Sequence, residues 1–247
     1  MIEFKGVSKK FDSKVVLDDV SFTIERGETF VIIGLSGAGK TTILRHIAGF
    51  LDPERGDILI ENVKMNGAGA RVRAALRLKM GFLFQSGALI NWLSVRENVA
   101  LPLVEHKLGT ADEINRIVDE KLKLLQLSDA GEKMPSDISG GMKKRAGLAR
   151  AIVRNPDIIL YDEPTSGLDP VMSARINELI IRMQEKLNVT SVVVTHDMES
   201  AYYIADRIAM LYEGRIIECG TPDQIRTSIN PVVQQFIEGR IAGPIEG

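Results

Sequence analysis

The segment from Gly34 to Thr41 constrains the fold of this chain most, because it has the pattern G-x-x-x-x-G-K-T. The residues before it, 29–33, form a β-branched and aromatic run that is typical of a buried parallel strand. The residues after it, 42–49, have helical spacing and stop at a glycine. A glycine loop between a strand and a helix can wrap closely around phosphate, since successive backbone N–H groups and the helix N-terminus direct positive dipole at it.

The loop therefore predicts that the chain binds a nucleoside triphosphate. We expect Lys40 to reach the terminal phosphates and the Thr41 hydroxyl to ligate Mg²⁺. The residues predicted to contact the nucleotide here are Gly34, Leu35, Ser36, Gly37, Ala38, Gly39, Lys40, Thr41 and Thr42.

Composition narrows the class of protein. The formal net charge of −2 gives no global basic field for nucleic acid, so we expect no nucleic-acid partner. A hydrophobic content of 45% and a charged content of 26% are ordinary for a soluble globular protein. No stretch approaches the roughly 18 uninterrupted apolar residues of a membrane span. We expect a cytosolic protein unless a partner holds it at a membrane.

Alternating strand and helix patterns around 29–49 and 157–205 predict an α/β protein with a parallel-sheet core. Short strand-like runs at the start predict an antiparallel β subdomain, and a helical pattern at about 86–155 predicts an inserted helical subdomain. We assign 1–230 to a nucleotide-binding domain and 231–247 to a short C-terminal tail. Further predicted elements are strands at 56–60 and 80–84, helices at 110–127 and 140–154, and a terminal hairpin at 208–218.

An apolar run that ends in Asp162 and Glu163 supplies what phosphoryl transfer needs besides a phosphate cradle. Asp162 is expected to support Mg²⁺, and Glu163 to face the water that attacks the γ-phosphate. The alternative is an acidic pair that only caps a helix. The phosphate loop upstream favours the catalytic interpretation.

Ser139, Gly140 and Gly141 open a predicted helix. A serine hydroxyl and free N–H groups at a helix N-terminus form a second anion site, although Ser139 could also be a plain N-cap beside a turn. One fold can hardly bring this segment and the phosphate loop onto the same γ-phosphate. The pair therefore points to a composite site shared by two chains.

Taken together, these motifs resemble the ATP-binding-cassette (ABC) ATPases in order and spacing, over residues 1–225. The resemblance implies a P-loop ABC-ATPase fold and a head-to-tail homodimer that sandwiches two ATP molecules between phosphate loops and Ser-Gly-Gly segments. The motifs that carry it are 34–41, Gln85, 139–142, Asp162-Glu163, 166–169 and His196.

The resemblance also implies individual roles. Phe11 would stack on adenine with Val16 beside it, and Gln85 would reach Mg²⁺ and the attacking water. Asp169 would communicate across the dimer, and His196 would contact the γ-phosphate. As alternatives, Phe11 could be a core residue, Gln85 could cap a strand end, and His196 could be purely structural.

Within that family, the segment 84–103, Met142 and the tail at 231–244 resemble the ATPases of MCE-associated lipid transporters of the Mla type. This implies phospholipid transport between membranes by a permease that docks near Gln85–Leu103. It also implies an MCE lipid-binding protein, a small accessory subunit and a peripheral location on the cytoplasmic face of the inner membrane. Trp92 is expected either to mark the docking groove or to be buried in the core.

Three other interpretations share some of these motifs. An ABC importer for another small solute would have every catalytic residue named above. A non-transport cassette protein that acts on ribosomes or DNA is disfavoured by the single cassette, the absence of a sustained heptad run and the absence of basic excess. A nucleotide switch without turnover is disfavoured by Glu163 and His196.

Overall fold

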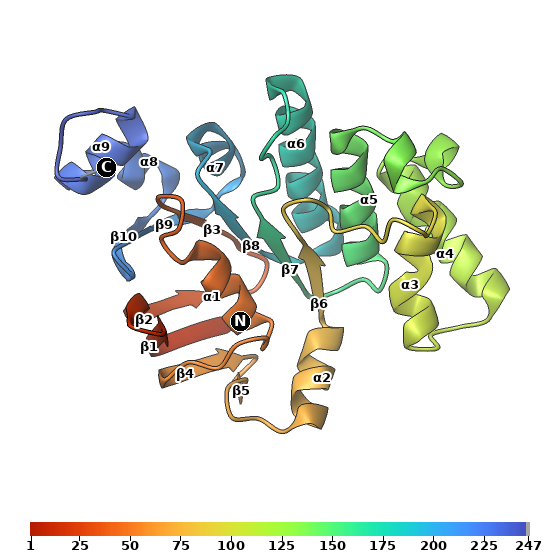
Figure 1. The fold of residues 1–247 in the computed structure, drawn as a ribbon, viewed down its shortest axis with the longest axis horizontal. Coiled ribbons are helices and arrows are strands. Elements are labelled where there is room, and N and C mark those ends of the chain that lie inside the picture. The colour runs from red at the N-terminus through yellow and green to blue at the C-terminus, as the bar shows by residue number, and fades with distance from the viewer. Residues whose placement is uncertain (246–247) are drawn as a thin grey trace.

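Parallel strands form the centre of the molecule, in a six-stranded sheet of order β10-β9-β3-β8-β7-β6 (Figure 1). The structure is a computed structural model that describes residues 1–245. Strands β6, β7, β8, β3 and β9 pair in parallel, and β10 pairs with β9 antiparallel. The strands are β3 (Thr29–Ile33), β6 (Met80–Leu83), β7 (Ile158–Asp162), β8 (Thr190–Thr195), β9 (Arg207–Tyr212) and β10 (Arg215–Gly220).

A second sheet, of order β2-β1-β4-β5, is antiparallel throughout and covers one face of the central sheet. Phe22 of this sheet stacks on Phe4 at 4.5 Å between ring centroids and on Phe30 of β3 at 5.3 Å. The two sheets therefore share one hydrophobic cluster. The strands are β1 (Ile2–Phe11), β2 (Lys14–Ile24), β4 (Arg55–Ile60) and β5 (Val63–Lys64).

Helices cover the opposite face of the central sheet, where Val31, Tyr161 and Val193 belong to a hydrophobic cluster with α5, α6 and α7. Strands β3, β7 and β8 are buried at every residue, which explains why their sequences are mostly apolar runs rather than alternating ones. Helices α1 (Lys40–Ile47) and α2 (Ala70–Leu78) belong instead to the cluster on the face of the antiparallel sheet. The remaining helices are α3 (Val95–Glu105), α4 (Ala111–Leu124), α5 (Gly140–Ile152), α6 (Pro170–Leu187), α7 (Met198–Ile204), α8 (Pro222–Arg226) and α9 (Pro231–Glu238), with 3₁₀ turns at Ser128–Ala130 and Pro135–Asp137.

The helices α3, α4 and α5 come between β6 and β7 in the chain, and in Figure 1 α3 and α4 lie at the end of the molecule away from α9. The predicted strands at 56–60 and 80–84, the helices at 110–127 and 140–154 and the terminal hairpin are all confirmed, with ends shifted by a few residues. Helix α9 lies within the predicted tail, and its residue Val233 is fully buried in the core. Within residues 1–245, every helix is too short or too polar to cross a lipid bilayer.

Candidate functional site

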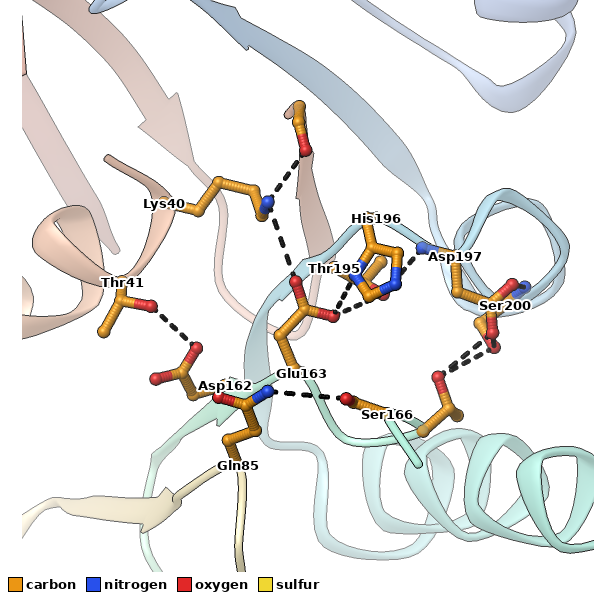
Figure 2. A network of polar contacts seen from close by, with 12 residues as sticks. Lys40, Thr41, Gln85, Asp162, Glu163, Ser166, Thr195, His196, Asp197 and Ser200 are labelled. Carbon is orange, nitrogen blue, oxygen red and sulfur yellow. Dashed lines mark hydrogen bonds and ion pairs between the residues drawn. The ribbon is translucent and has the colours of Figure 1, made fainter. Parts of the chain in front are cut away.

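The candidate site forms where neighbouring parallel strands end at one edge of the central sheet. Strand β3 ends level with β8, with Ile33 opposite Thr195, and β7 ends level with β8, with Asp162 opposite Val194. The carboxyl edge of such a sheet is where α/β proteins bind ligands. Gly34 follows β3, Phe84 and Gln85 follow β6, Glu163 follows β7, and His196 follows β8. Figure 2 shows Gln85, Glu163 and His196 together at this edge.

The loop after β3 requires glycine at two positions. Gly34 and Gly39 have φ of 150° and 106°. A Cβ atom would lie 2.3 Å from the Leu211 carbonyl oxygen at Gly34, and 2.9 Å from the Val16 carbonyl oxygen at Gly39. Since Gly39 has no side chain with which to cap α1, the first N–H groups of that helix remain available to an anion.

Lys40 begins α1 and points back over the loop. Its Nζ donates to the carbonyl oxygens of Gly34 at 2.7 Å and Leu35 at 3.0 Å. Burial lowers the pKa of Lys40, while the neighbouring carboxylates Glu163 and Asp162 oppose that shift. The ammonium group is thus held beside the loop, where it can meet a phosphate.

Thr41, the residue after Lys40, contacts Asp162, the last residue of β7. The Thr41 hydroxyl donates to Asp162 Oδ1 at 2.9 Å, as Figure 2 shows. Burial raises the pKa of Asp162 and the hydrogen bond from Thr41 opposes that rise. A carboxylate whose charged form is penalised by burial gains from a nearby cation.

Glu163 lies at the centre of the site, directly after β7 (Figure 2). Its Oε1 is 3.6 Å from Lys40 Nζ, and its Oε2 is 2.9 Å from His196 Nδ1. The Thr195 hydroxyl donates to the same Oε2 at 3.3 Å. Glu163 also has a left-handed backbone with φ of 48°, which is uncommon outside glycine. Strained residues of this kind cluster at active sites.

These groups surround a cavity of about 370 Å³. Phe11 stands at its rim with 42% of its surface exposed, so the alternative that Phe11 is a core residue is wrong. The lining residues are Phe11, Val16, Ser36, Gly37, Gly39, Lys40, Thr41, Thr42, Gln85, Glu163 and His196.

Comparison with known proteins assigns the family. Residues 17–166 match the sequence model of the family described as ABC transporter. The chain belongs to the ABC transporter family. Its ABC-ATPase fold, predicted from the motifs, is confirmed, and the chain is an ATP-binding ATP hydrolase of this family.

Two relatives with descriptive names align with nearly the whole length of this ABC ATPase. A protein of Haemophilus influenzae named intermembrane phospholipid transport system ATP-binding protein MlaF is 41% identical over 99% of this chain and 93% of its own length. A protein of Mycobacterium leprae named probable ribonucleotide transport ATP-binding protein mkl is 43% identical, over 99% of this chain and 70% of its own length.

A solved structure has a similar fold. It is an ATP-binding cassette dimer in a post-hydrolysis state with ADP and phosphate bound. It is 34% identical to this chain and covers 90% of it, with a TM-score of 0.83.

The predicted second anion segment of the ABC ATPase lies apart from this cavity. Ser139 caps α5 by accepting from the Met142 N–H at 3.3 Å, and it is exposed together with Gly140. Asp169 likewise caps α6 by accepting from the N–H groups of Val171 and Met172. Neither Ser139 nor Asp169 lines the cavity, so any role in ATP binding requires another chain.

Gln85 does line the cavity, at the start of the segment that joins β6 to α3. Its Nε2 donates to Ser166 Oγ at 3.4 Å. Further along this segment the side chain of Trp92 is 79% exposed, so the expectation that Trp92 is a core residue is wrong.

Two residues that support the site, Thr195 and Asn98, were not predicted from the sequence. Thr195 holds the carboxylate of Glu163, and its place as the last residue of the strand before His196 was the available signal. Asn98, fully buried in α3, anchors the segment that carries Gln85 and Trp92. Its amide group bonds both the N–H and the carbonyl of Ile90, and also reaches the carbonyl oxygens of Leu93 and Ser94.

We expect Asn98→Ala to lower the free energy of unfolding by about 2–3 kcal/mol, because it leaves buried polar backbone groups without partners. Urea denaturation measures this loss, and limited proteolysis reports loosening between residues 85 and 94. The exposed neighbour variant Asn91→Ala serves as the control. Equal stability of the two variants would contradict the anchoring role.

Proposed function

We propose that this chain is the ATPase subunit of a phospholipid transporter, in which ATP closes a homodimer and drives a separate membrane permease. The observation that carries this proposal is the 41% identity, over almost the full length of both chains, with a relative named as the ATPase of an intermembrane phospholipid transport system. The relative named for ribonucleotide transport keeps an importer for another solute as the second candidate.

ATP hydrolysis in this proposal depends on positioning and electrostatics. Water attacks the γ-phosphorus, the bond to the bridging oxygen of ADP breaks, and no covalent intermediate with the protein forms. Glu163 polarises the water and accepts its proton, since its carboxylate is held between Lys40 at 3.6 Å and His196 at 2.9 Å. Lys40 and the loop N–H groups stabilise phosphate charge, and His196 stabilises the γ-phosphate.

Mg²⁺ fits the oxygen donors that meet in this site. Thr41 and Gln85 line the cavity, and the Thr41 hydroxyl lies 2.9 Å from Asp162 Oδ1. Hydroxyl, carboxylate and amide oxygens are the ligands that Mg²⁺ prefers. When bound with ATP, the ion would neutralise phosphate charge.

Thr41→Val tests this assignment because it removes the hydroxyl while nearly keeping the shape of the side chain. We expect the affinity for ATP with Mg²⁺ to fall about tenfold, or about 1.4 kcal/mol. The affinity in excess EDTA should stay unchanged. Titration of a fluorescent ATP analogue under both conditions measures the difference, and an equal loss in both would remove Thr41 from the metal site.

The homodimer would place the N-terminus of α5, with the exposed Ser139 and Gly140 and the buried Gly141 after them, on the nucleotide held by the partner's phosphate loop. Support comes from the dimeric solved cassette and from the separation of this segment from its own cavity. In the closed dimer Phe11 and Val16 would contact adenine, and Asp169 would communicate between the sites.

A permease would dock beside Gln85–Leu103. A groove of about 390 Å³ reaches this segment at Phe84 and Pro102. Aromatic and apolar side chains line it together with His106 and three arginines, Arg77, Arg150 and Arg154. Phe50, Leu78 and Phe84 in this groove are exposed. This permease, together with an MCE protein and a small accessory subunit, would hold the chain at the cytoplasmic face of the inner membrane.

We assign 1–230 to the nucleotide-binding domain, with a helical subdomain at about 86–155, and 231–247 to the tail.

Purification of the tagged full chain from native membranes tests the transport function. We expect a multi-span permease and a lipid-binding protein to co-purify, and the complex to move labelled phospholipid between vesicles only with hydrolysable ATP. The Glu163→Gln complex is the matched control. ATPase stimulation by ribonucleotides without lipid movement would favour the second candidate.

A further inference from the structure

A buried lysine of α5 contacts the backbone of Glu163. Lys144 donates from Nζ to the Glu163 carbonyl oxygen at 2.7 Å, and only 4% of the lysine surface is exposed. Lys144 follows Ser139, the N-cap of the same helix, by little more than one turn. It therefore joins the exposed start of α5 directly to the centre of the site.

The bond falls on a residue whose backbone conformation matters. Glu163 has φ of 48°, its N–H donates to the Val194 carbonyl oxygen at 2.9 Å, and its own carbonyl is held by Lys144. Contacts on both sides of the Glu163 Cα atom thus over-determine a left-handed conformation that a glutamate otherwise disfavours. That conformation aims the carboxylate at Lys40 and His196.

Burial alone would not favour a lysine at this position. Burial lowers the pKa of Lys144 to about 8, while the carboxylates of Glu163 and Asp162 oppose the shift. The helix has a separate attachment to the Gln85 segment, because Arg150 donates to the carbonyl oxygens of Gly87 and Ala88 at 2.9 and 2.8 Å. Attachment of α5 to the rest of the protein therefore does not depend on Lys144.

We propose that Lys144 is a positioning residue for ATP hydrolysis, which fixes the backbone of Glu163 and thereby aims its carboxylate at the reacting water. This inference rests on the proposed function in one respect, that Glu163 activates the water. It adds a residue that touches neither nucleotide nor metal in that scheme and acts only through Glu163.

Steady-state ATP hydrolysis by Lys144→Met, which keeps the length of the side chain and removes the donor, tests the proposal. We expect kcat to fall about 10²-fold, since small misplacement of a catalytic group has effects of that size. The KM for ATP and the midpoint of thermal unfolding should remain close to wild type. Lys144→Arg, which restores a cationic donor, should recover most of kcat.

Lys143→Met is the matched control, because Lys143 is the preceding residue of α5 and the described residues show no hydrogen bond or ion pair of its side chain. A wild-type kcat in Lys144→Met would overturn the proposal. So would an equal loss of kcat in the Met and Arg variants, or a loss confined to KM and thermal stability. Glu163→Gln distinguishes failure of the proposed function from failure of this inference. If Glu163→Gln keeps full turnover, the proposed role of Glu163 fails. If Glu163→Gln is inactive while Lys144→Met keeps full turnover, only the positioning role of Lys144 fails.

Discussion

Glu163→Gln should lower ATP turnover by about 10³-fold while ATP still binds, within the range expected for loss of a general base. The amide keeps the size of the side chain but cannot accept the proton of the attacking water. Its oxygen can still accept from Thr195, so the local hydrogen bonding is largely retained. Single-turnover hydrolysis of radiolabelled ATP measures the rate, and binding of a fluorescent analogue measures the affinity.

The same variant should accumulate as a closed dimer with ATP, because closure no longer leads to hydrolysis. Light scattering with and without ATP detects this change in mass. Glu185→Gln makes the same chemical change at an exposed position of α6 and should behave as wild type in every assay. Steady-state turnover in Glu163→Gln close to wild type would assign the base to another residue.

Gly140→Asp should abolish the ATP-dependent dimer and lower turnover by about 10²-fold. The new carboxylate would face the phosphates of the ATP held by the partner, and like charges that face each other across an interface cost several kcal/mol. Gly140 is the first residue of α5, and the nearest atom to an added Cβ is Leu168 Cδ2 at 3.9 Å. The chain itself therefore has room for the new side chain. An acidic residue in the first turn also complements the helix dipole, by about 0.3–1 kcal/mol.

The variant consequently separates assembly from folding. Its midpoint of thermal unfolding should equal or exceed that of wild type, while Glu163→Gln combined with Gly140→Asp stays monomeric with ATP. Ala111→Asp adds the same charge to the first residue of α4 and should leave the dimer intact. A stable ATP-bound dimer of the combined variant would exclude Gly140 from the nucleotide interface.

Much of the fold could be predicted from local patterns. The central strands β3, β7 and β8 are buried at every residue, so they appear in the sequence as short runs rich in β-branched residues between turns. Glu163 is predicted because it directly follows such a strand, whereas the role of His196 comes from the family resemblance. Both follow strand ends, which parallel pairing brings to one edge of the sheet. The phosphate loop was found because its glycines meet a backbone requirement that is local to the chain.

What could not be predicted depends on contacts between distant segments. In the sequence Lys144 is one of several basic residues in the predicted helix 140–154, and only the folded structure shows its partner, the carbonyl oxygen of Glu163. The exposure of Phe11 and Trp92 is also a property of the folded surface. Helix α3 was not predicted from its pattern, since Pro102 lies inside it.

The placement of the site after strand ends has a consequence for heredity. The groups assigned to hydrolysis lie at or just beyond strand ends rather than in the apolar core, so size-conserving substitutions there, such as Glu163→Gln, should silence the enzyme and leave the folded chain abundant. Silent chains would still pair with normal ones in the proposed homodimer. A cell with one normal and one silent gene copy would therefore assemble only a minority of fully competent dimers.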